Sequence, residues 1–417
     1  MTVGVAYVIG GGLSGLAAAT ALAEAGKTVT LIEAAPQAGG RCRSYFDKHL
    51  GTDIDNGNHL VLSGNLDAMR YLQRIDAMRT VDILPPNFPF KDISEGLIWT
   101  IRLGAGRIPW WIFCPRHRVP GTKLADYWRS RVLLTADADA TVSETLQQTG
   151  QLYERFWKPF AIAVLNTEPE TASARLLAPV IRETLGQGGR ACRPVMPQRG
   201  LGFSFVDPAL DYLRAHGGTV RLGTRCRAVE IDEGRVSALD LDGERVSVNA
   251  DDIVISALPP GLAGELLPIS PIPDAYRAIV NIHFRITADS SLPRITGILG
   301  GLAEWLFVRG DVASVTVSAA DHMVEQSPEE IAERIWTDIA PILNMDEDAM
   351  PPYRVLKEKR ATMAQTPEQN RLRPPRTTAI RNLWLAGDWT DTGLPATIEG
   401  AIRSGHMSAA LALALNK

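Results

Sequence analysis

The stretch "VAYVIGGGLSGLAAATALAEAGKTVTLIEA", residues 5–34, decides the fold of this chain. A short apolar run at 5–9 is typical of a buried parallel strand, and it leads directly into three glycines with the spacing G-x-G-x-x-G. Strong helix formers follow over 13–25, and a second apolar run at 28–32 predicts another strand. The stretch therefore predicts a β-α-β unit that binds a dinucleotide.

Each glycine of this motif has a physical reason. Gly10 makes the tight turn, Gly12 lets a pyrophosphate approach the backbone, and Gly15 lets the helix pack closely on the strand. The free N–H groups at the start of the helix face the phosphates. Glu33 follows eighteen residues after Gly15, where an acid binds ribose hydroxyls and argues against NADP. A plain glycine turn would explain the spacing, but not the strands, the helix and Glu33 together.

A second turn, Gly39–Gly40–Arg41, follows the acid. An arginine at this point can neutralise the pyrophosphate as a bidentate donor. The alternative is a surface turn with a solvated arginine. We expect the pyrophosphate role, because the turn comes so soon after the ribose acid.

The bulk composition bounds the class of protein. A chain of 417 residues is too long for one hydrophobic core and predicts two or three lobes. A hydrophobic content of 45% and a charged content of 22% are typical of soluble globular proteins. The net charge is −4 and the basic residues are scattered, so we expect no nucleic-acid partner.

The four cysteines lie far apart and show no metal-ligand spacing, so we expect no metal and buried thiols in a reducing compartment: Cys42, Cys114, Cys192 and Cys226. The N-terminus has no basic n-region or cleavage site, which predicts that there is no signal peptide. No window reaches eighteen uncharged apolar residues. We therefore expect a cytoplasmic protein.

A second glycine-rich stretch, "LWLAGDWTDTGLPATIEGAIRSG", occupies residues 383–405. Together with the N-terminal motif it resembles the flavin-dependent amine oxidase and phytoene desaturase superfamily, in which a strand ends at "AGD" and a helix begins at "EGA". The resemblance implies that Asp388 binds ribityl hydroxyls and that the backbone at Gly400–Ala401 faces the N1/O2 edge of the flavin. The positive end of that helix would stabilise the anion of reduced flavin. An ordinary capped helix is the alternative.

Two further stretches resemble parts of the same superfamily. "DIDNGNHLVLSGN", residues 53–65, resembles the strand beside the isoalloxazine and places His59 near its reactive face. Strands are expected over 217–259, and in the superfamily such a segment contacts adenine through its backbone, here at Cys226. Core strands without ligand contact are an equally weighted interpretation of that segment.

The resemblance implies FAD as the cofactor and an α/β fold. A Rossmann-like FAD-binding domain of the amine oxidase/GDI-like type is interleaved with a mixed α+β substrate domain. The FAD-binding domain is expected to comprise 1–79, 196–265 and 375–417, and the substrate domain 80–195 and 266–374. The expected cofactor contacts are Gly10, Gly12, Leu13, Ser14, Gly15, Glu33, Ala34, Gly40, Arg41, Gly57, Asn58, His59, Cys226, Gly387, Asp388, Thr397, Ile398, Gly400 and Ala401.

Four stretches, at 55–65, 157–174, 197–213 and 386–405, resemble one branch, the squalene-associated flavoproteins of bacterial hopanoid synthesis. That branch acts as hydroxysqualene dehydroxylases. The resemblance covers nearly the whole chain and implies an FAD-dependent oxidoreductase that reduces hydroxysqualene, or a similar long isoprenoid, to squalene. Hydride would pass from flavin N5 to an allylic carbon, and the hydroxyl would leave as water.

Two departures count against amine oxidation. Thr397 stands where amine oxidases of this group place an aromatic residue. These oxidases also use a lysine near flavin N5, and no lysine occurs between Lys158 and Lys357.

Departure of a hydroxyl in an apolar cavity needs a proton donor. His59 is the first candidate, because imidazole can be charged near neutral pH and the motif places it near the flavin. The alternative is a histidine that only hydrogen-bonds flavin or backbone. Asp55 is the second catalytic candidate, with a structural or ribityl-binding role as its alternative.

Two other functions stay open. An oxidative polyene desaturase or isomerase of the phytoene type would share the cofactor and the lobes but remove hydride. A lipid-binding escort resembling Rab GDP-dissociation inhibitors would share the fold without using flavin. The paired flavin motifs count against the escort. No second nucleotide motif appears, so the electron donor is unknown.

One segment of the expected substrate domain combines tryptophan with arginine. Residues 96–121 read "GLIWTIRLGAGRIPWWIFCPRHRVPG". Such a composition favours a membrane–water interface, which would make the protein peripheral on the inner membrane face. Aromatic residues that simply pack inside the substrate domain are an equally weighted alternative, because glycines and prolines break any helical pattern.

Overall fold

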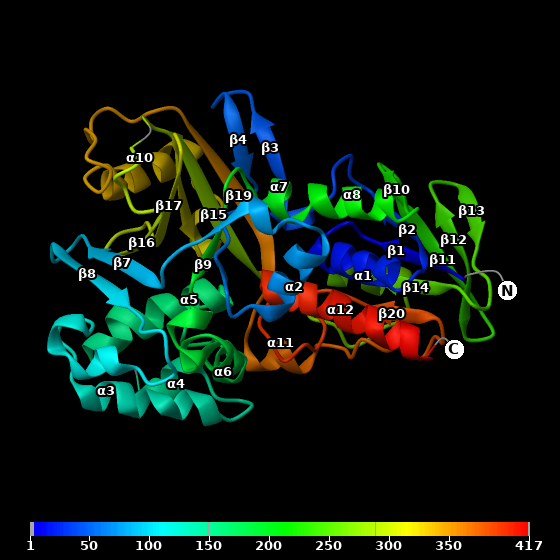
Figure 1. Ribbon diagram of the computed structural model, residues 1–417, viewed down its shortest axis with the longest axis horizontal. Helices are drawn as coiled ribbons and strands as arrows, with labels where there is room; N and C mark the ends of the chain where they lie inside the picture. Colours follow the sequence, from blue (N-terminus) through cyan, green and yellow to red (C-terminus); the bar gives the residue numbers. More distant parts are fainter. Residues whose placement is uncertain (1–3, 148–149, 288, 416–417) are drawn as a thin grey trace.

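The computed structural model describes residues 4–147, 150–287 and 289–415. It is an elongated molecule with a parallel sheet at one end and a larger mixed sheet at the other (Figure 1). Both termini lie at the end that holds the parallel sheet. The α/β fold expected from the sequence is confirmed.

The N-terminal β-α-β unit forms as predicted, with β1 at Val5–Ile9, α1 at Leu13–Glu24 and β2 at Thr28–Glu33. Three strands from distant parts of the chain complete a five-stranded parallel sheet of order β10-β2-β1-β14-β20. Their bounds are Thr219–Leu222 for β10, Ile253–Ser256 for β14 and Leu383–Leu385 for β20.

The last helix, α12 at Ile398–Leu415, lies directly along α1. Small residues make the close approach possible: a Cβ added to Gly405 would lie 2.1 Å from the carbonyl oxygen of Ser14. The two helices therefore bring the two ends of the chain together beside one sheet. Because α1 begins at the glycine motif and α12 begins at the C-terminal motif, this packing also brings the two motifs together (Figure 1).

A seven-stranded sheet forms the opposite end, in the order β19-β15-β18-β17-β16-β7-β8. Its strands are β7 (Asn87–Asp92), β8 (Leu97–Arg102), β15 (Tyr276–Arg285), β16 (Ile295–Leu299), β17 (Trp305–Arg309), β18 (Val312–Val317) and β19 (Tyr353–Met363). Helix α10, at Pro328–Ile339, covers one face, where Trp336 packs against Phe284. A helical layer near β7 and β8 holds a separate apolar cluster.

The remaining elements are shorter. The small strands are β3 (Ser44–Asp47), β4 (Thr52–Asp55), β5 (Val61–Leu62), β6 (Val81–Ile83), β9 (Pro194–Pro197), β11 (Cys226–Asp232), β12 (Arg235–Leu241) and β13 (Glu244–Ser247). Of these strands, β11, β12 and β13 lie at the end of the molecule near the N-terminus (Figure 1). The remaining α-helices are α2 (Leu66–Arg74), α3 (Leu124–Arg129), α4 (Val142–Leu146), α5 (Lys158–Leu165), α6 (Ala174–Glu183), α7 (Leu201–Phe205), α8 (Asp207–Ala215), α9 (Pro260–Leu266) and α11 (Pro367–Arg371). The strands expected over 217–259 are confirmed.

The two sheets follow the segments named from the sequence. All five strands of the parallel sheet fall within 1–79, 196–265 and 375–417, and the seven-stranded sheet falls within 80–195 and 266–374. The residue boundaries of the two domains stay a prediction. Among the described residues, no helix has the length and hydropathy needed to cross a membrane. Three of the cysteines are buried as expected, whereas Cys114 is only partly buried, because it lies in a surface loop.

Candidate functional site

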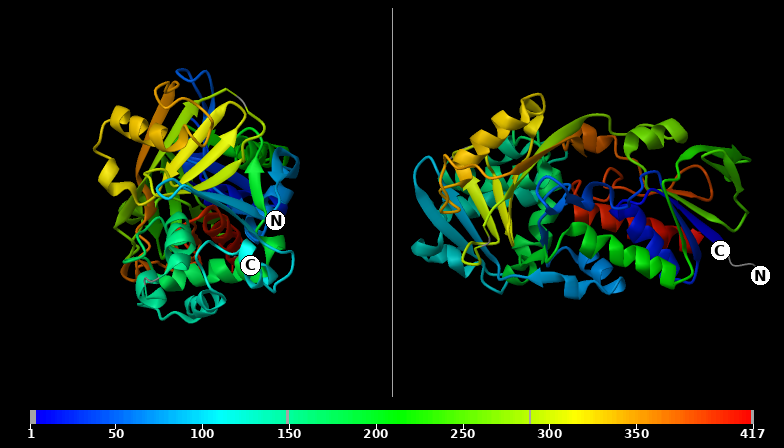
Figure 2. Two further views of the ribbon diagram at one scale, coloured as in Figure 1. Left: turned by 90° about the vertical axis from the view of Figure 1, so that its left-hand side faces the viewer. Right: turned by 90° about the horizontal axis from the view of Figure 1, so that it is seen from above.

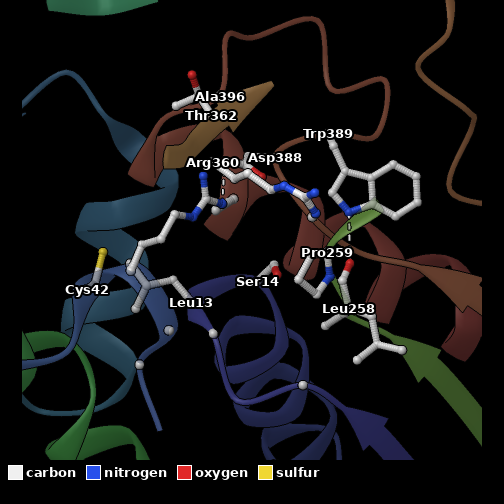
Figure 3. A pocket seen from close by; sticks show the side chains of 18 of the residues that line it. Leu13, Ser14, Cys42, Leu258, Pro259, Arg360, Thr362, Asp388, Trp389 and Ala396 are labelled. Carbon is white, nitrogen blue, oxygen red and sulfur yellow. Dashed lines mark hydrogen bonds and ion pairs between the residues drawn. The ribbon is translucent and has the colours of Figure 1, made fainter. Parts of the chain in front are cut away.

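A cavity of about 600 Å³ lies between the two ends of the molecule. It opens where β1, β2, β14 and β20 finish, at the carboxyl edge of the parallel sheet, and strands β15 and β19 form its far wall. Figure 3 shows Leu13 and Ser14, at the start of α1, across the cavity from Thr362 and Ala396. Open α/β sheets bind their ligands at this edge.

The glycine motif is placed as its spacing predicts. Gly10 has a positive φ of 110°, and its N–H donates to Ile32 across the sheet at 2.8 Å. A Cβ on Gly15 would lie 1.9 Å from the carbonyl oxygen of Gly10, so only glycine permits this helix–strand packing. Gly12 differs, because a Cβ there would meet no protein atom within 4 Å and Gly12 lines the cavity. The space that Gly12 leaves open is therefore part of the ligand site.

The carboxylate of Glu33 is held in a fixed position at one end of the cavity. Its two oxygens accept hydrogen bonds from the backbone N–H groups of Gly11 at 2.7 Å and Ala35 at 2.8 Å. Ala34 and Cys226 line the same part of the cavity. The thiol of Cys226 has a pKa raised to about 11 by burial, so it is neutral.

Arg41 joins the N-terminal and C-terminal motifs. Its guanidinium donates to the carboxylate of Asp388 at 2.7 Å and to the carbonyl of Ala361 at 2.6 Å. Asp388 raises the pKa of Arg41, so the side chain stays charged. The arginine side chain is 43% exposed and lines the cavity, so it can still meet an anion there. An ion pair between residues 347 positions apart fixes both motifs at one site.

The residue after Asp388 was missed by sequence reasoning. The ring of Trp389 fills the space beside Gly387, where an added Cβ would lie 2.4 Å from the indole nitrogen. That nitrogen donates to the carbonyl of Leu258 at 3.0 Å, as the dashed line in Figure 3 shows. Trp389 lines the cavity, and its position next to "AGD" is the sequence signal that could have indicated it.

The start of α12 contributes Thr397, Ile398 and Ala401 to the cavity lining, but Gly400 does not line it. The N–H of Gly400 donates to the Thr397 hydroxyl at 3.1 Å, and the N–H of Ala401 donates to the Thr397 carbonyl at 2.9 Å. These two amides are thus used in the first turn of the helix. The positive end of α12 still points at the site, and direct contact of Gly400–Ala401 with a flavin edge stays a prediction.

The loop at Gly57–Asn58–His59 forms the other end of the cavity. Asn58 holds the loop against the seven-stranded sheet, because its N–H donates to Asn281 at 3.3 Å and its side chain donates to the Thr316 hydroxyl at 3.1 Å. Burial, reinforced by the charge of Arg41, lowers the pKa of His59 to about 4. The sequence-based expectation of a charged imidazole near neutral pH is therefore not met in this environment.

Asp55 does not line the cavity. Its carboxylate is buried and accepts hydrogen bonds from the Ser44 hydroxyl and, at 2.8 Å, from the N–H of Leu201. The second oxygen pairs with Arg309 of β17 at 2.7 Å. These contacts tie β4 to the seven-stranded sheet, and they favour the structural role over the catalytic one.

Several residues of the far wall carry no signal in the sequence. Asn281, Arg360 and Thr362 belong to β15 and β19, more than 200 residues after the N-terminal motif. Asn281 stands among apolar residues of β15, whereas Arg360 ends a charged run in β19, and neither context indicates a ligand site. Only the folding of the seven-stranded sheet over the parallel sheet brings them to the cavity.

Comparison with known proteins now adds to this geometry. Residues 13–413 match the family described as flavin containing amine oxidoreductase. The chain belongs to this family. A hydroxysqualene dehydroxylase of Rhodopseudomonas palustris is 45% identical over 99% of both chains. One of Zymomonas mobilis is 45% identical over 98% of this chain and 99% of that protein. Within the family, the chain is a member of the hydroxysqualene dehydroxylase group.

More distant members of the family carry other names. A probable zeta-carotene desaturase of Synechococcus elongatus is 22% identical over 96% of this chain and 97% of that protein. Putrescine oxidase bound to putrescine superposes with a TM-score of 0.72 at 18% identity, over 99% of each chain. At that identity the likeness shows the fold alone. The family makes the protein a flavin-dependent oxidoreductase.

Proposed function

We propose that this protein binds FAD and uses it in reduced form to convert hydroxysqualene to squalene. The observation that carries the proposal is the 44–45% identity to three hydroxysqualene dehydroxylases over nearly the whole chain. The carotenoid desaturases among the relatives are only 21–22% identical and do not favour the oxidative alternative. The cavity also argues against a lipid-binding escort that does not use flavin, because it contains the anchored Glu33 and the Arg41–Asp388 pair, which suit a dinucleotide cofactor.

The cavity fits FAD better than a mononucleotide. One end has the features of an ADP site: the helix start at Gly12, the open space beside it and the anchored carboxylate of Glu33. The opposite end of the cavity is lined by His59 and Thr397. Arg41 and Asp388 lie between the motifs, where a pyrophosphate and a ribityl chain would connect the two ends.

Replacing a hydroxyl by hydrogen consumes one hydride and one proton and releases water. Bound reduced FAD supplies the hydride. The chain's own contribution is to hold the cofactor, to keep water away from an allylic centre, and to place the positive end of α12 where it would stabilise the anion of reduced flavin.

The proton donor is a separate part of the proposal. A neutral His59 is a weak acid, and the pKa near 4 favours the alternative in which its ring hydrogen-bonds flavin or backbone. We keep His59→Ala as the test, because the ring lines the cavity. A variant that binds FAD but loses single-cycle turnover would support a role in the reaction. Unchanged turnover would remove His59 from the mechanism.

An anaerobic single-turnover experiment tests the main proposal. Purified protein is loaded with FAD, reduced with dithionite and mixed with hydroxysqualene in detergent. Flavin absorbance and extracted lipid are then followed together. We expect flavin oxidation and squalene formation at the same rate. Reduced flavin that persists beside untouched substrate would contradict the proposal, and a protein that stays colourless after FAD is added would point to the escort.

A further inference from the structure

Exposed apolar side chains are concentrated in one segment of the chain. Among the described residues, thirteen large apolar side chains are exposed, and six of them fall within 25 consecutive positions. Trp110 and Trp128 are the most exposed of the six, at 68% and 70%. We call this set the 108–132 surface; it consists of Ile108, Trp110, Phe113, Leu124, Trp128 and Val132. A concentration of this kind marks an interaction site.

The surface is built from two neighbouring pieces, a loop with a short turn at Trp110–Phe113 and the helix α3 with the turn that follows it. Trp111 points inward from the loop and meets Tyr127 of α3 edge-on, with ring centroids 5.4 Å apart. Trp110 and Phe113 lie on the outside of the loop, with their ring centroids 5.8 Å apart. The inward tryptophan thus fixes the loop on α3 and leaves the outward rings presented to solvent.

This arrangement divides the tryptophan–arginine segment that the sequence indicated. Trp99 is buried in β8 and stacks on Phe90 at 5.5 Å, so that part of the segment packs inside. The exposed part lies farther along and extends beyond the segment into α3. Trp128 and Val132 lie outside the segment 96–121, and only the packing of α3 on the loop unites the two pieces.

The charge around the surface is strongly positive. Between residues 96 and 135 the chain has six arginines, one lysine and a single acid, Asp126, although the whole protein has a net charge of −4. Asp126 is occupied in capping the start of α3, where it accepts from the N–H of Lys123 at 2.7 Å. In the ranges that the structure describes, no salt bridge joins any of the seven cations to a carboxylate. Arg131 lies over the ring of Trp128 at 4.4 Å.

We propose that the 108–132 surface docks on a lipid bilayer that contains anionic lipid. Tryptophan rings with unpaired arginines suit the headgroup region, where the rings bury their apolar faces and the guanidinium groups meet phosphates. The occupant is a bilayer because, among the described residues, the seven cations of this segment make no salt bridge and lie in the same segment as exposed tryptophan and phenylalanine rings. Figure 2 shows this region at the end of the molecule remote from both termini.

The inner side of this surface continues toward the cofactor cavity. Trp111 and Tyr127 belong to an apolar cluster that also contains Trp157 and Leu165. The next residue, Asn166, donates its side-chain N–H to the hydroxyl of Thr362, in the cavity wall, at 3.0 Å. Packed contacts thus link the 108–132 surface to the cavity wall, and under the proposed function docking would place the cavity near a substrate dissolved in the bilayer. The docking proposal rests on the proposed function only where it concerns access of a lipid substrate to the cavity.

Co-sedimentation with vesicles tests the proposal. The FAD-loaded protein is mixed with vesicles of phosphatidylcholine alone and with vesicles that contain about one-third phosphatidylglycerol. We expect binding to the second kind only, because each arginine adds about fivefold in affinity for an anionic surface. Trp110→Ala/Trp128→Ala should weaken binding by about tenfold or more, and Arg116→Glu by about fivefold or more.

Matched controls lie elsewhere on the chain. Phe46 is an exposed aromatic residue of β3, and Arg79 is an exposed arginine beyond α2. Phe46→Ala and Arg79→Glu should bind vesicles like the unchanged protein. Equal sedimentation of the surface variants and these controls would overturn the proposal, as would binding of the unchanged protein to neither kind of vesicle. Sedimentation velocity without lipid is the third arm, and concentration-dependent dimers lost in the tryptophan variant would replace the bilayer by a second copy of this chain.

The readout does not depend on catalysis, so failure of the proposed reaction would leave the vesicle result intact. If both proposals hold, the surface variants keep full turnover on substrate in detergent and lose about tenfold in turnover on substrate supplied in anionic vesicles. Loss of turnover in detergent as well would contradict a purely docking role for the surface.

Discussion

The two ends of the cofactor cavity are built in different ways. The end near Glu33 comes mostly from one continuous stretch, residues 9–43, in which β1, α1, β2 and the turn at Gly40–Cys42 follow one another along the chain. The end near His59 is assembled from separate pieces, including β15, β19 and the start of α12, each of which lies more than 200 residues after His59 in sequence. A site made of one stretch depends on local packing, whereas a site made of many pieces depends on the contacts that hold the sheets together.

This difference predicts which substitutions act on which end. A change in the continuous stretch should abolish folding or cofactor binding without involving the substrate domain. A change in the ion pair that joins β4 to the seven-stranded sheet should lower the free energy of unfolding of the whole molecule. A change at the ring of His59 should have a small effect that depends on pH.

The largest effect is expected at Gly15. Gly15→Val places side-chain atoms against the carbonyl of Gly10, so we expect a loss of more than about 3 kcal/mol in the free energy of unfolding, or no soluble protein. Gly12→Val is the matched control, because it meets no protein atom within 4 Å and its φ is −73°. That variant should unfold within about 1 kcal/mol of the unchanged apoprotein but lose flavin. Equal stability of the two variants, measured by thermal unfolding of the apoproteins, would contradict the assigned roles of the glycines.

A smaller effect is expected at Asp55, where β4 is joined to the seven-stranded sheet. Asp55→Asn removes the charge that Arg309 faces while it keeps the shape of the side chain. We expect a loss of about 2–3 kcal/mol in the free energy of unfolding, because the partly buried Arg309 loses its charged partner and the buried amide accepts its hydrogen bonds less well than the carboxylate. The double variant Asp55→Asn/Arg309→Met should recover part of that loss.

Denaturant unfolding of the apoprotein measures the stability of both variants, and single-turnover rates of the folded protein measure activity. If Asp55 is structural, the folded single variant keeps its turnover rate. A variant with unchanged stability and no turnover would return Asp55 to the list of catalytic candidates.

The smallest effect is expected from titration of His59. The folded pKa is about 4 and the usual value is about 6.5, so the unfolded chain takes up a proton first as the pH falls. At pH values above 6.5 the difference in proton uptake has no effect on stability. As the pH falls from 6.5 toward 4, it lowers the free energy of unfolding. His59→Gln should remove the cost and gain about 1–2 kcal/mol at pH 5 relative to its effect at pH 7.5.

His283 also has a pKa near 4. It is present both in the unchanged protein and in the His59→Gln variant, so its contribution to the pH dependence of stability cancels when the two are compared. Thermal unfolding of the apoprotein at the two pH values gives the difference. If His59→Gln changes stability equally at both values, the imidazole is not held neutral by its environment, and its candidacy as a charged proton donor would be restored.

The sequence predicted much of the cofactor end. The spacing of Gly10, Gly12 and Gly15 and the position of Glu33 are local features, because each acts on a neighbour within one β-α-β unit. The same reasoning failed for the protonation state of His59, since burial and the distant charge of Arg41 decide that value. It also gave Asp55 a catalytic alternative that the ion pair with Arg309 does not favour.

By itself the sequence determined the dinucleotide motif, the C-terminal flavin motif and the branch of the family, because all three are carried by residue types at fixed spacings. Only the tertiary structure joined Arg41 to Asp388, placed Asn281 and Thr362 in the cavity wall, and packed Trp111 against Tyr127 of α3. These contacts join residues on separate elements, and the packing of helix on helix and sheet on sheet sets them. Spacing along the chain holds no record of such packing.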